Sequence, residues 1–423
     1  MKHMKIKLKS LIEFQIYYLL IVEVLISLFN IPSFVRYLLD VNMLALLLFN
    51  FQGKKNWIFG SKYRNVGLYA GAYMLAMLVS GLVNFVPLGQ YFWAIRNNFF
   101  YILFFFMCIK YLSGEDVERI MKRIVNLQAL NTLFGLYEYF VLELEGDYLG
   151  GFFGIEKGCN GYLNIYLCII TSYELCRYFY KKNSLVRLFL VVGSSILMAT
   201  LGELKIFYLE LLIIVFSCVL LARKSIKSFL TLASGVPAAF LGVQALTVIN
   251  PQAAKFLKSI EEMIEYSSRS DYGNGDIRIA RLTAIAQIND WFFGDSLWLK
   301  LFGYGFGACE SSETFNFFHS DFASRYDYLG YRNLSAAMSY LETGLIGLLG
   351  LGALFVVIFF YSHKIYGLTR DRKDISLFVQ IVSILCIINL WYNSAIRRPV
   401  AYLTFFALAS AFVCFKEAKS THR

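Results

Sequence analysis

Arg278 and Arg281 are the residues of this sequence whose type and spacing point most directly to chemistry. The apolar periodicity around them predicts a helix over residues 276–293, with Asp276 as its N-cap. On such a helix the two guanidinium groups share one face near the positive helix end. Because that arrangement suits a diphosphate group, we expect Arg278 and Arg281 to bind one.

Further cations lie beside apolar segments on the side that we assign to the outside of a membrane. One explanation is that these side chains simply extend to lipid head groups. Loops outside the cytoplasm are normally poor in Lys and Arg, however, so several cations there favour a binding role. We expect Arg96 and Lys205 to assist the diphosphate-binding pair; the wider group contains Arg36, Arg96, Lys205, Arg397 and Arg398.

Two residues qualify as a base for a hydroxyl acceptor. His319, one of only four histidines, is followed by Ser320 and Asp321, and an imidazole can accept a proton near neutral pH. An ordinary exposed loop histidine explains it equally well. Glu342 is the second candidate catalytic residue, although it could instead hold an arginine or mark a helix end.

Metal and cofactor sites are not expected. No group of His and Cys residues has the spacing of a metal site. Gly303, Gly305 and Gly307 do not make a nucleotide fingerprint, because no strand–turn–helix context surrounds them. Cys159 and Cys309 both fall in predicted outer loops, so a disulfide between them stays open.

The elements that must position these residues are membrane helices. The chain has 423 residues, of which 58% are hydrophobic and 16% charged. A soluble protein carries roughly a quarter charged residues. We predict about twelve apolar spans, at 11–29, 34–51, 66–87, 91–111, 120–142, 160–180, 186–201, 206–222, 229–249, 335–360, 376–393 and 398–415.

The distribution of Lys and Arg sets the orientation. Most of the 40 basic residues fall in alternate short segments, which places both termini inside. The same scattering over short loops argues against nucleic-acid binding despite the net charge of +11. The expected fold class is therefore an all-α polytopic bundle, divided into spans one to nine (1–249), one large partly helical extracytoplasmic loop (250–334), and spans ten to twelve with a cytoplasmic tail (335–423).

Two short motifs and the topology together resemble the O-antigen ligase/polymerase-like superfamily, which includes the Wzy-type polysaccharide polymerases. The run from Arg278 through Trp291 to Leu301-Phe-Gly-Tyr-Gly-Phe-Gly307 looks like the family segment R…W…L-x-G-x-G-x-G. Tyr340-Leu-Glu-Thr-Gly-Leu-Ile-Gly-Leu-Leu-Gly350 looks like its E-x-G-x-x-G helix start. The motifs cover about 75 residues. The family's ligases usually carry a histidine about ten residues before the glutamate, where this chain has Arg332-Asn333.

The resemblance implies a metal-independent glycosyltransferase of the cytoplasmic membrane with an outward-facing site. It would polymerise undecaprenyl-diphosphate-linked oligosaccharide repeats into capsule, exopolysaccharide or O-antigen. A flippase and a chain-length regulator would be its protein partners. Arg278, Arg281, Arg96 and Lys205 would hold the diphosphate, His319 or Glu342 would be the base, and loop aromatics (Trp291, Trp298, Tyr304, Phe306) would stack on sugars or dip into the membrane interface.

Two alternatives remain at this stage. A ligase that moves a finished glycan to another acceptor has the same composition. A secondary transporter or lipid-linked-sugar flippase belongs to another class, and it would place intramembrane carboxylates along a central pathway. The carboxylates to follow are Glu13, Glu23, Asp40, Glu138, Glu174 and Glu210.

Overall fold

A computed structural model describes residues 2–52, 64–222, 244, 260–270, 277–312, 314–369 and 371–421 of the protein. These parts of the chain consist of helices joined by turns, and they contain no β-sheet. The prediction of an all-α fold is confirmed for them.

Eleven of the twelve predicted apolar runs fall on helices; the twelfth, 229–249, lies outside the described residues apart from residue 244. The helices of these runs are α1 (Lys2–Leu19), α2 (Val22–Phe29), α3 (Leu38–Gln52), α4 (Arg64–Val83), α5 (Leu88–Tyr111), α6 (Gly114–Phe140), α7 (Asn160–Phe179), α8 (Leu185–Leu201), α9 (Lys205–Leu221), α16 (Ser335–Leu368), α17 (Lys373–Tyr392) and α18 (Ala401–Thr421).

Six helical segments of the described chain are long and apolar enough to cross a membrane, which indicates a multi-pass membrane protein. Two further apolar helices are shorter, at Leu185–Leu201 and Ala401–Lys416. Helix α6 is not among the six, because its first half is charged and begins with a capping box between Ser113 and Asp116. The six segments are Leu8–Phe29, Ser33–Asn50, Asn65–Val83, Leu88–Tyr111, Ser335–Leu368 and Lys373–Tyr392.

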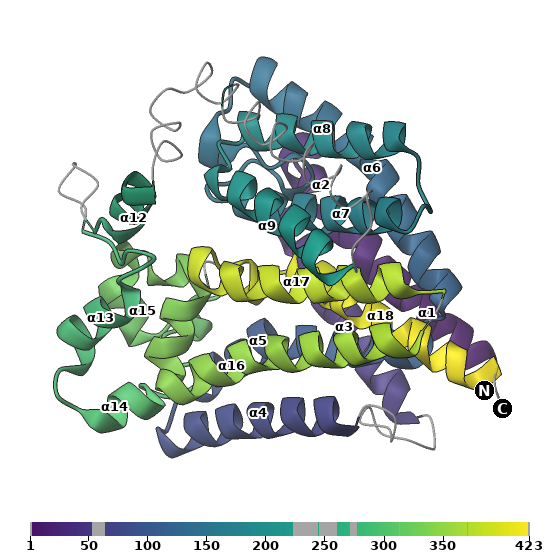
Figure 1. The fold of residues 1–423 in the computed structure, drawn as a ribbon. Coiled ribbons are helices and arrows are strands. Elements are labelled where there is room, and N and C mark those ends of the chain that lie inside the picture. The colour runs from purple at the N-terminus through teal and green to yellow at the C-terminus, as the bar shows by residue number, and fades with distance from the viewer. Residues whose placement is uncertain are drawn as a thin grey trace.

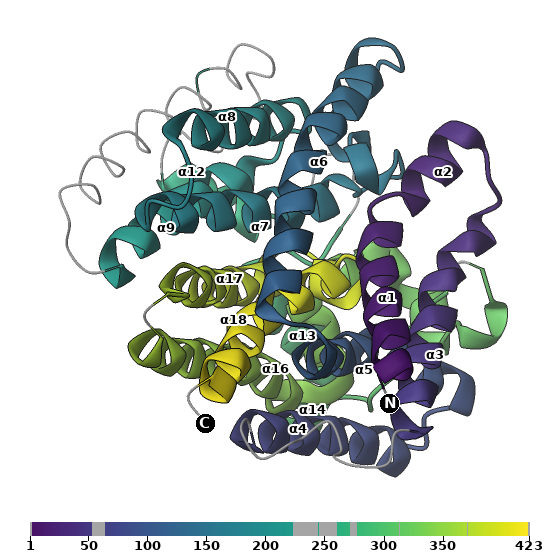
Figure 2. The ribbon, with the colours of Figure 1, turned by 90° about the vertical axis from the view of Figure 1, so that its right-hand side faces the viewer.

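Helix α18 lies at the centre of the bundle (Figure 2) and contacts α1, α5, α6, α7, α16 and α17. Its residues 401–415 are all buried, which agrees with a helix that is apolar on every side. The segment between α17 and α18 is therefore anchored in the middle of the molecule. This matters for the site, because Arg397 and Arg398 lie in that segment.

Both termini lie at one end of the bundle, and α12–α15 lie at the other (Figure 1). The segments that precede α7, α9 and α18 all reach the end that carries α12–α15, because residues from each of them line one common cavity, together with Trp93, Arg96 and Asn97 of α5. The chain thus returns to this end several times. The side chains that the sequence assigned to one membrane side are brought to one end of the molecule.

In its described part, the large loop contains four short α-helices: α12 (Ile260–Ser268), α13 (Ala284–Ile288), α14 (Leu297–Phe302) and α15 (Asp321–Tyr326). The prediction of a helix starting at Asp276 is wrong over the described residues 277–283, and Asp276 itself lies outside them. There the Arg278 N–H donates to the Ser270 carbonyl oxygen at 2.7 Å, and the Ile279 N–H donates to the Leu329 carbonyl oxygen at 2.9 Å. Partners outside the segment satisfy this backbone, so it forms no helical turn.

Helix α16 is kinked at Gly344, where φ is +59° and ψ is −159°. The kink frees two carbonyl groups, and the glycine-rich segment 303–307 occupies the gap: the Tyr304 N–H donates to the Leu341 oxygen at 2.9 Å, and the Gly305 N–H donates to the Glu342 oxygen at 2.8 Å. A Cβ on Gly344 would lie 2.3 Å from the Leu301 carbonyl carbon. The glycines therefore permit close backbone packing.

Candidate active site

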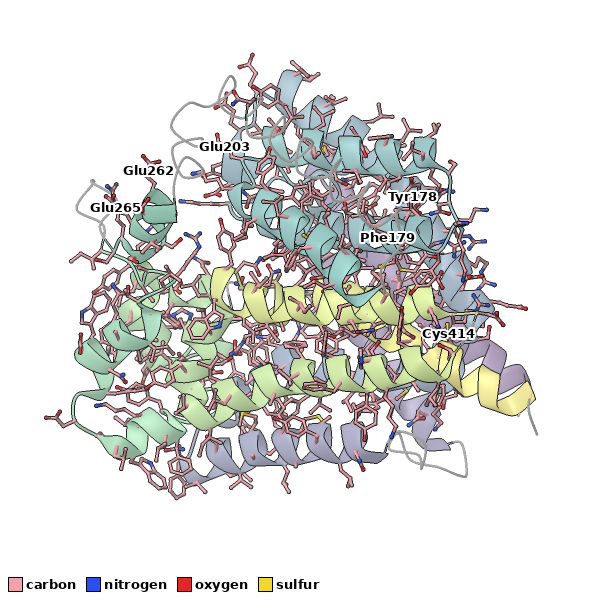
Figure 3. The ribbon with its side chains drawn as sticks, viewed as in Figure 1. Tyr178, Phe179, Glu203, Glu262, Glu265 and Cys414 are labelled. Atoms are coloured by element: carbon pink, nitrogen blue, oxygen red, sulfur yellow. The ribbon has the colours of Figure 1, made fainter. Side chains whose placement is uncertain are left out.

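A cavity of about 990 Å³ lies at the end of the bundle that carries α12–α15. Figure 3 shows one lining residue, Glu203, toward this end with Glu262 and Glu265 of α12, whereas Cys414 lies toward the termini. Stretches far apart in the sequence form the wall. Its cations are Arg36, Arg96, Lys157, Lys205, Arg278, Arg281, Arg332 and Arg398, and its carboxylates are Glu23, Glu145, Asp147, Glu156, Glu203 and Asp327.

Arg278 and Arg281, the expected diphosphate pair, both line the cavity, although no helix carries them. The Arg281 guanidinium lies 4.6 Å from the centre of the Tyr392 ring, and its Nε donates to the Tyr392 carbonyl oxygen at 3.2 Å. Tyr392 is the last residue of α17. These contacts fix the loop segment against the bundle and hold its charge at the cavity wall.

Arg96, one of the expected assisting cations, lies in the wall but is already paired. Its Nε and Nη2 each donate to the Asp40 carboxylate at 2.9 Å, and its Nη1 donates to Asn97 Oδ1 at 2.7 Å. The guanidinium also stacks 4.8 Å from the Trp93 ring centre. Asp40 neutralises much of this charge, so Arg96 is better suited to shape the wall than to attract an anion alone.

Lys205 begins helix α9 directly after a tight turn in which Glu203 has φ +51°. Both charged residues, Glu203 and Lys205, line the cavity. Arg36, from the wider group, donates to Glu23 at 2.7 Å and to Glu156 at 2.5 Å. Arg36 therefore links helix α2 to the loop before α7.

Arg397 and Arg398 are adjacent in sequence but occupy different environments. Arg397 ends a short 3₁₀ turn, and Arg398 follows in an extended conformation, with φ −120° and ψ 166°. Successive side chains point in opposite directions when the backbone is extended. Arg398 faces the cavity and, in the described chain, lies within ion-pair distance of no carboxylate. Arg397 is buried and does not line the cavity.

Arg397 is held between two buried carboxylates. Its Nη2 donates to Glu310 at 2.6 Å and to Glu342 at 2.9 Å. Burial alone lowers the pKa of Arg397, but the charges of Glu342 and Glu310 and their hydrogen bonds outweigh burial and raise this pKa further above its usual value. Asn97 donates to Glu310 at 2.9 Å and accepts from Arg96, so a continuous polar network joins the cavity wall to the interior.

Glu342, the second candidate base, holds an arginine. It is fully buried, is not part of the cavity wall, and also accepts the Gly307 N–H at 3.1 Å. Both carboxylate oxygens are therefore occupied. Of the roles left open by the sequence, the geometry favours the ion pair with Arg397, and it does not place Glu342 where it could receive a proton from an acceptor in the cavity.

His319, the first candidate base, lies just behind the cavity wall. Its Nδ1 is 2.8 Å from Ser311 Oγ, and Ser311 lines the cavity. The His319 carbonyl oxygen accepts from Gln90 Nε2 at 3.3 Å. Through the Ser311 hydroxyl group, the His319 imidazole is connected to the cavity. No feature of the sequence pointed to Ser311.

The loop aromatics expected to stack on sugars do not line the cavity. Phe306 is buried against Phe99, and Trp298 is half exposed on α14, which agrees with the alternative of an interfacial position. The aromatic residues of the wall come from elsewhere in the chain: Tyr37, Trp93, Tyr148, Phe153, Tyr162, Tyr328 and Tyr392.

The intramembrane carboxylates line no common pathway in the described chain. Glu138 accepts the N–H groups of Gly150 and Gly151, and Glu174 pairs with Arg187. Glu210 accepts from Asn164, Cys168 and Asn389. Of the carboxylates named from the sequence, only Glu23 lines the cavity, and it is paired with Arg36.

Cys159 and Cys309 do not pair; both are buried free thiols. Burial, assisted by nearby carboxylates, raises the pKa of each thiol, so neither is an activated nucleophile. Among the described residues, no group of three or more His, Cys, Asp or Glu side chains is arranged to hold a metal ion.

Comparison with known proteins gives no match: no family model matches the chain, and no curated protein is significantly similar to it.

Proposed function

We propose that the protein is a membrane glycosyltransferase that polymerises undecaprenyl-diphosphate-linked oligosaccharides at the outer face of the bacterial cytoplasmic membrane. One observation carries the proposal: Arg278, Arg281, Lys205 and Arg398, from three regions of the sequence, converge on a single cavity. A lipid diphosphate is an anion that such guanidinium groups bind well.

The proposed topology has about twelve spans with both termini in the cytoplasm. The position of the termini, which lie together at the end opposite the cavity, supports this topology. The cavity then opens on the outer side, where lipid-linked repeats are presented after flipping. The donor is already activated by its diphosphate, so no nucleotide sugar is needed at that side.

The proposed reaction transfers the growing glycan to a new repeat. The acceptor hydroxyl oxygen forms a bond to the anomeric carbon of the donor, and the bond from that carbon to the diphosphate oxygen breaks. The lipid diphosphate leaves with the electron pair, and cavity arginines stabilise its charge. The hydroxyl proton passes to Ser311 Oγ while Ser311 gives its own proton to His319 Nδ1, across the 2.8 Å contact.

Arg398 and Arg278 have the leading roles in this scheme. Arg398 forms no ion pair with a carboxylate in the described chain, so its guanidinium group can bind phosphate. Its neighbour Arg397 fixes the turn from inside through Glu310 and Glu342. Arg278 and Arg281 approach from the loop, so binding of the diphosphate would tie the loop to the bundle.

The decisive test is deletion of the gene followed by sizing of the cell-surface glycan. Loss of long chains with retention of single lipid-linked repeats supports the polymerase. Full-length chains that stay on the carrier lipid would support a ligase instead. Failure of lipid-linked repeats to reach the outer leaflet would support a flippase.

The Arg278→Ala variant sharpens this test. It should abolish chain extension while membrane insertion stays normal, because the loop segment around Arg278 is held by backbone hydrogen bonds. The measurement is glycan sizing in the deletion strain complemented with the variant. Chains of wild-type length would remove Arg278 from the proposed site.

A further inference from the structure

The tetrapeptide Asp-Tyr-Leu-Gly occurs twice in the chain, at 147–150 and at 327–330. A match of four residues carries no weight in sequence alone, but the aspartate and tyrosine of each copy lie in a 3₁₀ turn, Gly146–Tyr148 in the first copy and Asp327–Leu329 in the second. In both copies the leucine is buried. The aspartate and tyrosine of each copy line the same cavity, one from the loop before α7 and the other from the segment before α16.

The two tyrosine rings are available to a ligand, unlike other rings of the wall. Trp93 has Phe318 stacked at 4.8 Å and the Arg96 guanidinium at 4.8 Å, and Tyr392 carries Arg281. Tyr148 and Tyr328 are 45% and 69% exposed, and in the described chain neither has a ring or cation partner. Their faces are open at the cavity.

Polar groups beside each tyrosine are held in defined orientations. Asp147 Oδ1 accepts from Asn160 Nδ2 at 3.1 Å, which leaves lone pairs on the carboxylate. Asp327 forms a bidentate pair with Arg332, with both N–O distances 2.6 Å, and Arg332 also lines the cavity. Carboxylates repel phosphate but accept hydrogen bonds from hydroxyl groups, so this part of the wall suits a hydroxyl-rich ligand.

We propose that the two Asp-Tyr turns form a carbohydrate-binding subsite beside the cations that bind the diphosphate. Pyranose rings pack their apolar C–H faces on Tyr148 and Tyr328. Asp147 and the Asp327–Arg332 pair bind their hydroxyl groups. This inference rests on the proposed function, and it assigns the glycan part of the lipid-linked substrate to these turns.

The test measures binding of the full-length protein, in lipid nanodiscs, to an array of immobilised bacterial oligosaccharides of three to six sugars. Tyr148→Ala and Tyr328→Ala should each weaken binding about tenfold, and the double variant about 100-fold, whereas the phenylalanine variants should stay within about twofold. Tyr137→Ala is the matched control, because Tyr137 is 42% exposed but lies outside the cavity wall. Unchanged thermal unfolding checks that each variant is folded.

A second arm separates this subsite from the diphosphate site. Vesicles that contain undecaprenyl diphosphate should bind wild type and both tyrosine variants equally, and Arg398→Gln should lose that binding. Oligosaccharide binding that is equal in wild type and the tyrosine variants, or absent from wild type, overturns the subsite. If wild type binds oligosaccharides but does not bind the vesicles, only the diphosphate proposal is overturned.

Discussion

Both ends of the helix bundle carry many cations, but the ion-pair partners of these cations differ between the two ends. At the end with the termini, Asp374 lies near Lys182 and Arg177, and Glu118 pairs with Arg177 and Arg372. At the cavity end, Arg36 and Arg96 pair with Glu23 and Asp40, but Arg398 faces the cavity and, in the described chain, lies within ion-pair distance of no carboxylate.

The difference shows which charges orient the protein and which could bind a substrate. In the proposed topology, cations at the termini end follow the positive-inside rule, and several of them form ion pairs between loops. Cations at the cavity end then lie on the side where this rule predicts few of them, and several line one cavity. A ligand-binding role would account for these cations.

Loss of Arg397 should have the largest effect, because it leaves two buried carboxylates without their cation. Arg397→Leu should destabilise the fold by about 3–5 kcal/mol, the usual cost of breaking a buried ion pair. Thermal unfolding of the purified protein and its yield in the membrane fraction are the measurements. The triple variant with Glu310→Gln and Glu342→Gln should recover part of the loss; stability equal to wild type in Arg397→Leu alone would show that the network is not structural.

Arg398→Gln should leave the fold intact and reduce chain extension about 1,000-fold, within the range found when a group that stabilises a developing charge is removed. The contrast with Arg397 is informative, because the two residues are adjacent in the sequence but Arg397 is buried between two carboxylates whereas Arg398 lines the cavity. Glycan sizing and thermal unfolding are measured together. Normal chain extension in this variant would mean that Arg398 takes no part in catalysis.

The sequence predicted which cations share one end of the molecule, because the positive-inside rule and the alternation of spans depend only on residue order. It could not separate Arg397 from Arg398, since their roles depend on one extended residue after a 3₁₀ turn. It also could not choose between the two roles that it left open for Glu342, a base or the partner of an arginine. Glu342 has the sequence context of a catalytic residue, and only the packing shows that both of its oxygens are occupied.

Residues of the site that were missed have no local signal. Ser311 is ordinary in sequence and becomes relevant through a contact with a residue eight positions away. Tyr148 and Tyr328 are two of 29 tyrosines, and only their open faces in one cavity distinguish them. The helix expected at Arg278 failed for a related reason, because long-range hydrogen bonds replaced the local ones.

His319→Gln should lower chain extension about 100-fold, the lower range for loss of a general base. Initial rates on purified lipid-linked repeats are the measurement. Ser311→Ala should lower the rate by a similar factor if the serine links the base to the cavity. A wild-type rate in either variant would remove the relay.

Arg372→Gln should have the smallest effect and completes the comparison of the two ends. Arg372 pairs with Glu118 at the termini end, and both side chains are about a third exposed, so their ion pair is worth less than about 1 kcal/mol. Chain extension should stay at the wild-type level, and the thermal midpoint should move by a few degrees at most. The variant removes one guanidinium, as Arg398→Gln does, so it controls for a general loss of positive charge. A loss of chain extension as large as that in Arg398→Gln would contradict the division of roles between the two ends. Removal of either cation would then act through the net charge of the protein.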